Sequence, residues 1–402
     1  MQQVSKNNLL KYGRLFLAFI FGLIWLIRGP IPIPTHSGIA KGDFRGYWSA
    51  SYLLSQSQNF SDTDLLFDIE RSKAGWDGDF VIKTWNPPWL LSLLLPYTFF
   101  SFDRAAWLWF ITNITLVFTA GIVAWLAMAQ TENGRKWAWL GALSSVIFAP
   151  ALTALYMGQV NTLVFFGLAM TLFFHQKERS GAAGVALSLT MVKPHLVYIT
   201  IPILMLRALL KKDWRFIFGF TGSLLLLSNI TFILRPSFLI EYFGSVDDGN
   251  LLNWVTPTLG GYLKATLGWH QADLMGVVVL PIMLIWWWVN RHKINFNELV
   301  QISLLISVIT APFGWGYDVI VLLIPLLQIL VWVIEKRVAK TVRLAYILAL
   351  LGLDVLAFYH RIHMQSEVDA FWIPLTIAIL YFTARYFKAA SQKSAPYSPS
   401  VQ

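Results

Sequence analysis

The chain contains no cysteine and few charged residues for its length. None of the 402 residues is cysteine, which excludes disulfides, thiol chemistry and cysteine-based zinc sites. Charged residues make up 13% of the sequence and hydrophobic residues 56%, and the mean hydropathy is +0.58. A water-soluble globule with this balance would not stay dispersed, so the composition indicates a protein that folds in lipid.

Motifs that hold nucleotides or metal ions are also missing. The sequence has no phosphate-binding glycine loop, no dinucleotide-binding glycine pattern and no His-Glu-x-x-His or other metal-ligand spacing. No segment between the apolar runs on the basic side is long enough to fold as a soluble domain for a nucleotide sugar. We therefore predict no metal site and no bound cofactor.

Apolar runs recur from one end of the chain to the other. A helix needs about 20 apolar residues to cross a hydrocarbon core of about 30 Å, and continuous runs favour helices over a barrel. We predict an all-α integral membrane protein in which residues 1–402 form a single polytopic domain. Asp354 lies within one run, where a charge is expected to pair with a neighbouring span. About twelve spans are expected, at 12–28, 105–128, 138–155, 160–175, 181–193, 194–210, 215–233, 272–290, 298–312, 318–334, 343–359 and 371–387.

Lysine and arginine are distributed unevenly between the loops. The first apolar run resembles a signal peptide, but no small-residue cleavage site follows, so it is predicted to be the first span. If the amino terminus is cytoplasmic, most of the 31 basic residues fall on the cytoplasmic side, as the positive-inside rule requires. This predicts a multi-pass plasma membrane protein with both termini cytoplasmic, including a tail at 388–402. The bias also explains the isoelectric point near 9.6 without nucleic acid as a partner.

The longest loop, 29–104, is then extracytoplasmic. Its aromatic and aliphatic residues argue against disorder and predict helices that lie at the membrane interface. Within it, the run from Asn86 to Pro96 is too short and too proline-bounded for a comfortable span. We predict an interfacial helix here, with a short true span as the alternative. Counting it as a span would place the later basic loops outside.

Asp43 begins a helical pattern close to the predicted outer end of the first span. Apolar residues at helical spacing follow it as far as Leu54, so its carboxylate suits the N-cap of a surface helix. A carboxylate at the outer interface is also placed to take a proton from an acceptor hydroxyl. Both roles, helix cap and general base, stay open at this point.

Amides and charged side chains gather at the same predicted depth. Gln159 and Asn161 lie between the third and fourth spans, where their amides suit sugar hydroxyls or helix ends. Lys193 and His195 flank a proline break after the fifth span. Lys193 suits a contact with a prenyl-linked phosphate, or it snorkels to the interface. Asp318 suits either substrate orientation or the cap of the following helix.

Five short motifs occur in a fixed order along residues 10–335. They are Asp43-Phe-x-x-Tyr-Trp-x-Ala-x-x-Leu-Leu54, Asn86-Pro-Pro88 with Leu-Leu-Pro96, Gly158-Gln-Val-Asn161, Ala183-Gly-Val185 with Met191-Val-Lys-Pro194, and Pro312-x-x-Trp315. Each is weak alone. In order and on one predicted face, they resemble glycosyltransferase family 87, the polyprenyl-phosphate-sugar-dependent membrane mannosyltransferases with the GT-C fold.

The resemblance implies a GT-C-like bundle that moves a hexosyl group, mannosyl in this family, with inversion. The donor would be a polyprenyl-phosphate sugar and the acceptor a hydroxyl of a lipid or glycan on the extracytoplasmic face. Asp43 would be the general base. The residues expected to bind the donor phosphate are Lys193, His195 and Tyr317, and those expected to bind sugar or acceptor are Tyr47, Trp48, Asn86, Gln159, Asn161, Trp315 and Asp318.

One motif departs from the family pattern, and two other classes of function fit the spans. Members of this family usually have a histidine within a few residues after the tryptophan of the last motif. In this chain Gly316 and Tyr317 follow Trp315. A transporter or lipid-sugar flippase should place charges or broken helices near the midplane in matched halves, but the predicted midplanes are almost free of charge. A non-catalytic scaffold does not explain why the polar candidates share one depth. The sequence therefore favours chemistry on the outer face.

Overall fold

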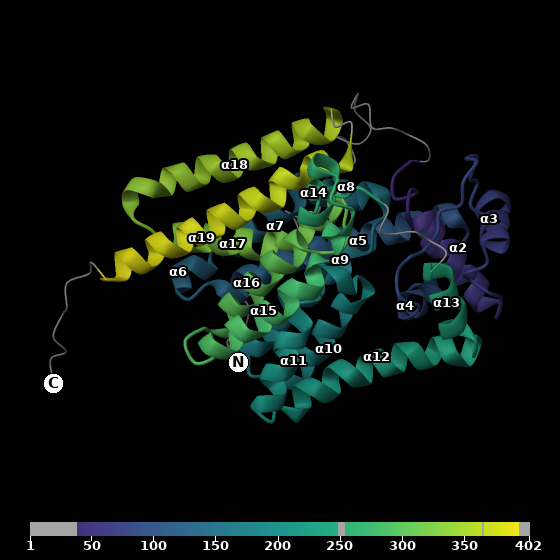
Figure 1. Cartoon of the computed structure of the whole chain (residues 1–402), viewed down its shortest axis with the longest axis horizontal. Coiled ribbons are helices and arrows are strands. Elements are labelled where there is room, and N and C mark those ends of the chain that lie inside the picture. The colour runs from purple at the N-terminus through teal and green to yellow at the C-terminus, as the bar shows by residue number, and fades with distance from the viewer. Residues whose placement is uncertain (1–37, 248–253, 364–365, 394–402) are drawn as a thin grey trace. The chain divides into compact units, whose positions relative to one another are not determined.

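The computed structural model describes residues 38–247, 254–363 and 366–393 (Figure 1). All regular secondary structure in these ranges is helical, which confirms the predicted all-α class for the described part of the chain. Every described helix belongs to one compact unit that begins at Ile39. The predicted first span at 12–28 lies outside the described residues.

Six helical segments, of 19 to 27 residues, are long and apolar enough to cross a membrane. The longest of them matches the predicted second span closely, and the others match later predicted spans. Apolar side chains on these helices remain exposed, among them Phe218, Leu226 and Ile233, as lipid-facing residues do. The six segments are α5 (Phe102–Met128), α12 (Trp214–Leu234), η5 with α15 (His270–Leu274, Met275–Asn290), η6 with α17 (Gly316–Leu322, Leu323–Ile334), α18 (Lys340–His363), and η7 with α19 (Glu367–Phe371, Trp372–Lys393).

The predicted span at 138–155 is a bent pair of helices. α7 (Ala138–Ile147) and α8 (Ala149–Met157) meet at an angle of 63°, and Pro150 stands in the first turn of α8. The backbone N–H of Ala149, which the break leaves without a partner inside the helix, donates to Asp354 Oδ1 of α18 at 2.9 Å. Because an unpaired N–H is costly in an apolar environment, this carboxylate stabilises the bend. The predicted pairing of Asp354 with a neighbouring span is thus confirmed. Counted as one span, the bent pair is a seventh.

The remaining predicted spans form shorter helices. Proline explains one break, because Pro194 has no N–H to donate and separates η2 from η3. At about 1.5 Å per residue, helices of this length do not reach across the hydrocarbon core alone. The predicted count of about twelve spans therefore stays a prediction, whereas six or seven are supported by length in the described ranges. The shorter helices are α9 (Asn161–Gln176), α10 (Ser180–Ser188), η2 (Leu189–Val192), η3 (Pro194–Val197), α11 (Thr200–Leu210) and α16 (Phe296–Ile309).

Glycine allows two pairs of helices to approach closely. Gly121 of α5 and Gly141 of α7 face each other, and a Cβ added to either would overlap the backbone carbonyl oxygen of the other. Gly184 of α10 lies in the same way against α12, where its added Cβ would overlap the carbonyl oxygen of Phe216. Such small-residue contacts are typical of helix packing in membranes. The hydrophobic effect does not drive helices together in lipid, so association depends on close packing, which small residues allow.

The long loop before α5 is helical for much of its described length. α2 (Phe44–Ser55) packs against α3 (Thr63–Ser72), α4 (Trp89–Leu94) and η1 (Leu95–Phe99), and α4 also packs on α12. With 6 residues, or 11 with η1, the Asn86–Pro96 region is too short to cross the bilayer. The alternative of a short true span therefore gains no support from length, and the interfacial helix stays a prediction. Residues 73–88, which we call the strap, join α3 to α4 without a helix.

Three further helices complete the described chain. α6 (Glu132–Arg135) leads into α7, α13 (Phe238–Asp247) follows α12, and α14 (Leu259–Leu267) packs against η5 and η7. Figure 1 shows α18 beside α19 at the carboxyl-terminal end of the described chain.

The lack of cysteine makes the wild-type chain its own background for a topology test. Lys73 follows α3 and Lys293 lies between α15 and α16, and both are exposed. With the predicted orientation, a membrane-impermeant maleimide should label Lys73→Cys in intact cells and Lys293→Cys only after permeabilisation. Wild type should stay unlabelled in both conditions. Labelling of Lys293→Cys alone in intact cells would invert the predicted topology.

Candidate functional site

A cavity of about 590 Å³ lies where the strap, the start of α2, the η2–η3 break and the start of η6 meet. Its lining is mostly aromatic and aliphatic, with a few charged and polar groups, as ligand sites usually are. These segments are far apart in the sequence, so the cavity depends on the tertiary fold. The lining residues are Asp43, Tyr47, Phe80, Val81, Ile82, Lys83, Trp85, Asn86, Pro87, Val192, Lys193, Pro194, His195, Tyr242, Trp254, Phe313, Trp315 and Tyr317.

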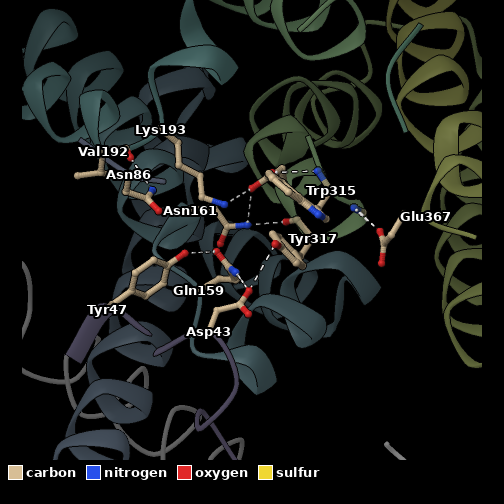
Figure 2. A network of polar contacts seen from close by, with 12 residues as sticks. Asp43, Tyr47, Asn86, Gln159, Asn161, Val192, Lys193, Trp315, Tyr317 and Glu367 are labelled. Carbon is tan, nitrogen blue, oxygen red and sulfur yellow. Dashed lines mark hydrogen bonds and ion pairs between the residues drawn. The ribbon is translucent and has the colours of Figure 1, made fainter. Parts of the chain in front are cut away.

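Asp43 stands at the N-cap position of α2 but does not act as a cap. Its side chain makes no hydrogen bond to the first turn of the helix. Instead, Oδ2 accepts from the side-chain amide of Gln159 and from the hydroxyl of Tyr317, the latter at 3.4 Å (Figure 2). The other carboxylate oxygen, Oδ1, has no hydrogen-bond partner among the described residues. The helix-cap interpretation is therefore wrong, and one oxygen of this carboxylate is left for another group.

The side-chain amide of Gln159 holds the carboxylate of Asp43 in position. α8 ends at Met157 and is capped by Gly158, which has φ +70°. A Cβ on Gly158 would clash with the carbonyl oxygen of Ala40 and with the Cβ of Phe44, the first residue of α2. This close approach brings Gln159 under α2, where its Oε1 accepts from the Tyr47 hydroxyl at 3.1 Å while its amide nitrogen donates to Asp43. Both Tyr47 and Gln159 are buried. The two hydrogen bonds determine which way the amide faces.

Lys193 is held inside the protein by an ion pair. Its Nζ lies 2.7 Å from Asp318 Oδ1, and both side chains are buried. The ammonium also lies 4.9 Å from the ring centre of Tyr317 and 5.9 Å from that of Trp315, within the range of cation–π attraction. Lys193 therefore does not snorkel to the interface, and that alternative is wrong. It lines the cavity that Asp43 also lines.

Asp318 both caps its helix and joins distant segments. Its Oδ2 accepts from the backbone N–H of Trp315, which closes the first turn of η6. Its Oδ1 accepts from Lys193 and from the amide of Asn161, the latter at 3.2 Å, and that amide also donates to the carbonyl of Tyr317 at 2.7 Å. Asn161 and Asp318 are buried behind the cavity wall rather than in it. They orient the residues that face the cavity.

The turn before η6 places two aromatic rings at the cavity. Trp315 and Tyr317 stack with ring centres 6.2 Å apart and an interplanar angle of 10°. The backbone N–H of Gly316 donates to Glu367 Oε2 at 3.0 Å, which ties the turn to η7 (Figure 2). The hydroxyl of Tyr317 is directed at Asp43.

The remaining predicted residues have different surroundings. His195 is on the cavity wall, its ring 4.4 Å from that of Phe313, and its buried Nε2 has no hydrogen-bond partner among the described residues. Asn86 also lines the cavity, but its amide donates to the Val192 carbonyl at 2.8 Å. Trp48 is buried away from the cavity, where its indole N–H donates to the Tyr97 carbonyl at 3.2 Å. The structure does not bring Trp48 to the other candidates.

Several lining residues escaped the sequence prediction. The strap contributes Phe80, Lys83 and Trp85, and Tyr242 comes from α13. The nearness of Lys83 and Trp85 to the Asn86-Pro-Pro motif was a usable signal, because Asn86 was already a candidate. Nothing comparable marks Tyr242, since its position depends on how α13 folds back towards the strap.

The surroundings of Asp43 raise the pKa of its carboxyl above the ordinary aspartate value. Burial is the main cause, because it disfavours the charged form, and the carboxylate of Asp318 acts in the same direction. The charge of Lys193 and the hydrogen bonds from Gln159 and Tyr317 partly oppose this effect. A carboxylate with a raised pKa, one oxygen free and a cation across the same cavity is suited to accept a proton from a bound hydroxyl. Among the described residues, no three histidine or acidic side chains come together as a metal site.

The apolar helices and this cavity define the class, a helical membrane protein with an internal cavity that holds a few charged and polar groups. The profile of glycosyltransferase family 87 matches residues 84–312, more than half of the chain. The chain therefore belongs to glycosyltransferase family 87, as the motifs predicted. No curated protein and no solved structure gives a match. The matched region includes Gln159 and Lys193 and leaves Asp43 and Tyr317 outside it.

The buried ion pair gives a test of the site's construction. Removing one partner leaves the other charge buried and uncompensated, which typically costs about 3 to 5 kcal/mol. Lys193→Met should therefore lower the thermal unfolding midpoint in detergent strongly, and the double variant Lys193→Met with Asp318→Asn should unfold at a higher temperature than Lys193→Met alone. If the two substitutions lower the midpoint additively, the two residues are not coupled.

Glu70 gives a pH-dependent test of the strap. It is fully buried near Arg45, both its carboxylate oxygens accept from the Ile82 N–H, and burial raises its pKa from 4.5 to about 7. The folded protein therefore binds an extra proton between these pH values, and stability falls as pH rises through this window. Above pH 7, Glu70→Gln should raise the free energy of unfolding by roughly 3 kcal/mol at most, and near pH 5 by much less. An equal gain at both pH values would mean that Glu70 does not titrate in this window.

Proposed function

We propose that the protein transfers a hexosyl group, mannosyl by its family resemblance, from a polyprenyl-phosphate sugar to a hydroxyl of a lipid or glycan acceptor. The observation that carries this proposal is the position of Asp43. Its carboxylate lines the cavity with Oδ1 free, while Gln159 and Tyr317 hold Oδ2. Membership of glycosyltransferase family 87 supports sugar transfer as the reaction class.

The lining of the cavity supports a lipid-linked donor. Aromatic rings such as Trp85, Trp254 and Trp315 offer faces for a sugar ring or a prenyl chain, and charged groups are few. Lys193 and His195 lie on one wall and supply a cation and an unpartnered ring nitrogen for a phosphate. A donor dissolved in the membrane also fits a chain that is mostly apolar helix.

The reaction is a single displacement. Asp43 Oδ1 accepts the proton of the acceptor hydroxyl as its oxygen forms a bond to the anomeric carbon of the sugar. The bond between that carbon and the phosphate oxygen breaks, and polyprenyl phosphate leaves with the bonding electrons. Lys193 stabilises the charge that develops on the leaving oxygen, as a fixed cation in a site with little water does. One displacement inverts the anomeric configuration.

The site belongs to the face that the charge bias predicts to be extracytoplasmic. The strap, the start of α2 and the η6 turn all fall in segments assigned to that side, in a protein with both termini cytoplasmic. Donor sugar would reach the cavity from the outer leaflet of the plasma membrane. The alternative of a transporter gains no support from the cavity, whose charged groups gather at a single site rather than in matched halves.

Asp43→Asn tests the assignment of the base. With a synthetic prenyl-phosphate mannose and candidate acceptors, the purified variant should transfer sugar about 10²- to 10⁴-fold more slowly than wild type. Asparagine keeps the shape of the side chain but does not take up the proton. Asp103→Asn is the matched control. Asp103 pairs with Lys41 at 2.5 Å, is largely exposed and does not line the cavity, so this variant should retain wild-type activity.

The pH profile gives the same test a second readout. The base acts only when ionised, so kcat/KM of the wild type should fall with decreasing pH, with a midpoint above that of an ordinary aspartate. Asp43→Asn should lack this acid limb. Full activity of the asparagine variant would remove Asp43 as the base, and no turnover of any prenyl sugar by wild type would contradict the proposed function.

A further inference from the structure

Lys83 is a cavity cation with no carboxylate partner among the described residues. It lies on the strap, half-buried, with its ammonium 5.5 Å from the ring centre of Trp85. A cation–π contact of this kind orients an ammonium but leaves its hydrogen-bond donors available. Lys193, by contrast, already gives a hydrogen bond to Asp318.

Hydrogen bonds hold the backbone of the strap on both sides of Lys83, and side chains of the strap line the cavity. The Ile82 N–H donates to both oxygens of Glu70, and the Phe80 carbonyl accepts from Trp76 Nε1 at 2.6 Å. On the other side of Lys83, the Trp85 carbonyl accepts from the hydroxyl of Tyr242 at 3.2 Å. Anchors on both sides therefore fix the position from which the Lys83 side chain extends.

The balance of charge around the cavity favours an anion at Lys83. Asp43 and Asp318 carry two negative charges when ionised, and Lys193 carries one positive charge, so these three groups alone would repel a phosphodiester. Lys83 brings the sum to zero. Because charges in a water-poor site interact strongly, this difference matters more here than at a surface.

We infer that Lys83 binds the phosphate of the lipid-linked donor, and that Lys193 serves mainly to hold Asp318 and stabilise the leaving oxygen. This inference rests on the proposed function and adds a donor-binding residue to it. The phosphate would then lie between the strap and the η2–η3 break, with its sugar directed towards Asp43. The same chemistry would suit an anionic headgroup on the acceptor, which the experiment separates from the donor.

The test compares donor and acceptor kinetics in variants of purified full-length protein. Lys83→Ala should raise KM for a synthetic prenyl-phosphate mannose by about 10- to 100-fold, the range of a charge-assisted contact, with acceptor KM nearly unchanged. Lys83→Arg should recover most of the donor affinity, and Lys83→Glu should bind donor worse than alanine. Donor KM of wild type should rise with ionic strength more steeply than that of Lys83→Ala.

Lys73→Ala is the matched control. Lys73 follows α3 on the same loop and also makes a cation–π contact, at 5.1 Å from the ring centre of Tyr52, but it does not line the cavity. Its substitution should leave both KM values unchanged. An unchanged donor KM in Lys83→Ala would overturn the inference, and so would an increase confined to the acceptor KM.

Direct binding separates this inference from the proposed function. Polyprenyl phosphate without sugar should bind wild type and Lys83→Arg, and bind Lys83→Ala about 10-fold or more weakly, whether or not an acceptor has been found. Equal binding to wild type and Lys83→Ala would overturn the role of Lys83 while leaving the transferase proposal standing. Failure of wild type to bind prenyl phosphate and to turn over any prenyl sugar would overturn both.

Discussion

The site depends on the buried carboxylate of Asp318. It receives hydrogen bonds from Lys193, from Asn161 and from the backbone of Trp315. These partners belong to the η2–η3 break, the start of α9 and the start of η6, three helix ends that would otherwise leave polar groups unpaired in an apolar interior. The carboxylate of Asp318 pairs these polar groups. It also holds in place the η6 turn, from which the Tyr317 hydroxyl donates to Asp43.

Much of the helical architecture could be predicted from the sequence, because continuous apolar runs in lipid form helices that satisfy their own backbone groups. The limits lie where tertiary contacts replace local pattern. Pro150 marks a break within one predicted span, but only the structure shows that Asp354 satisfies the freed N–H of Ala149. The helices α10 with η2, α11 and α16 have apolar sequences that predict spans, yet they are too short to cross the bilayer alone.

For the site, the sequence predicted which residues come together better than what each one does. Residues that belong to ordered motifs, such as Asp43, Gln159 and Lys193, are indeed neighbours. Hydropathy could not show that Gln159 faces Asp43 rather than a ligand, or that the Trp48 indole N–H is used by the Tyr97 carbonyl. Lys83 was missed because the strap has no periodicity, and its position comes from partners such as Glu70 and Tyr242.

The contact between Asp43 and Tyr317 joins residues that are 274 positions apart. During synthesis, α2 leaves the ribosome long before η6, so the carboxylate must wait for most of the helices to be inserted before Tyr317 reaches it. A nascent or truncated chain that ends before η6 therefore lacks Tyr317 and cannot complete the site, even if the loop before α5 has folded. The order of membrane insertion thus delays completion of the site until the chain is nearly whole.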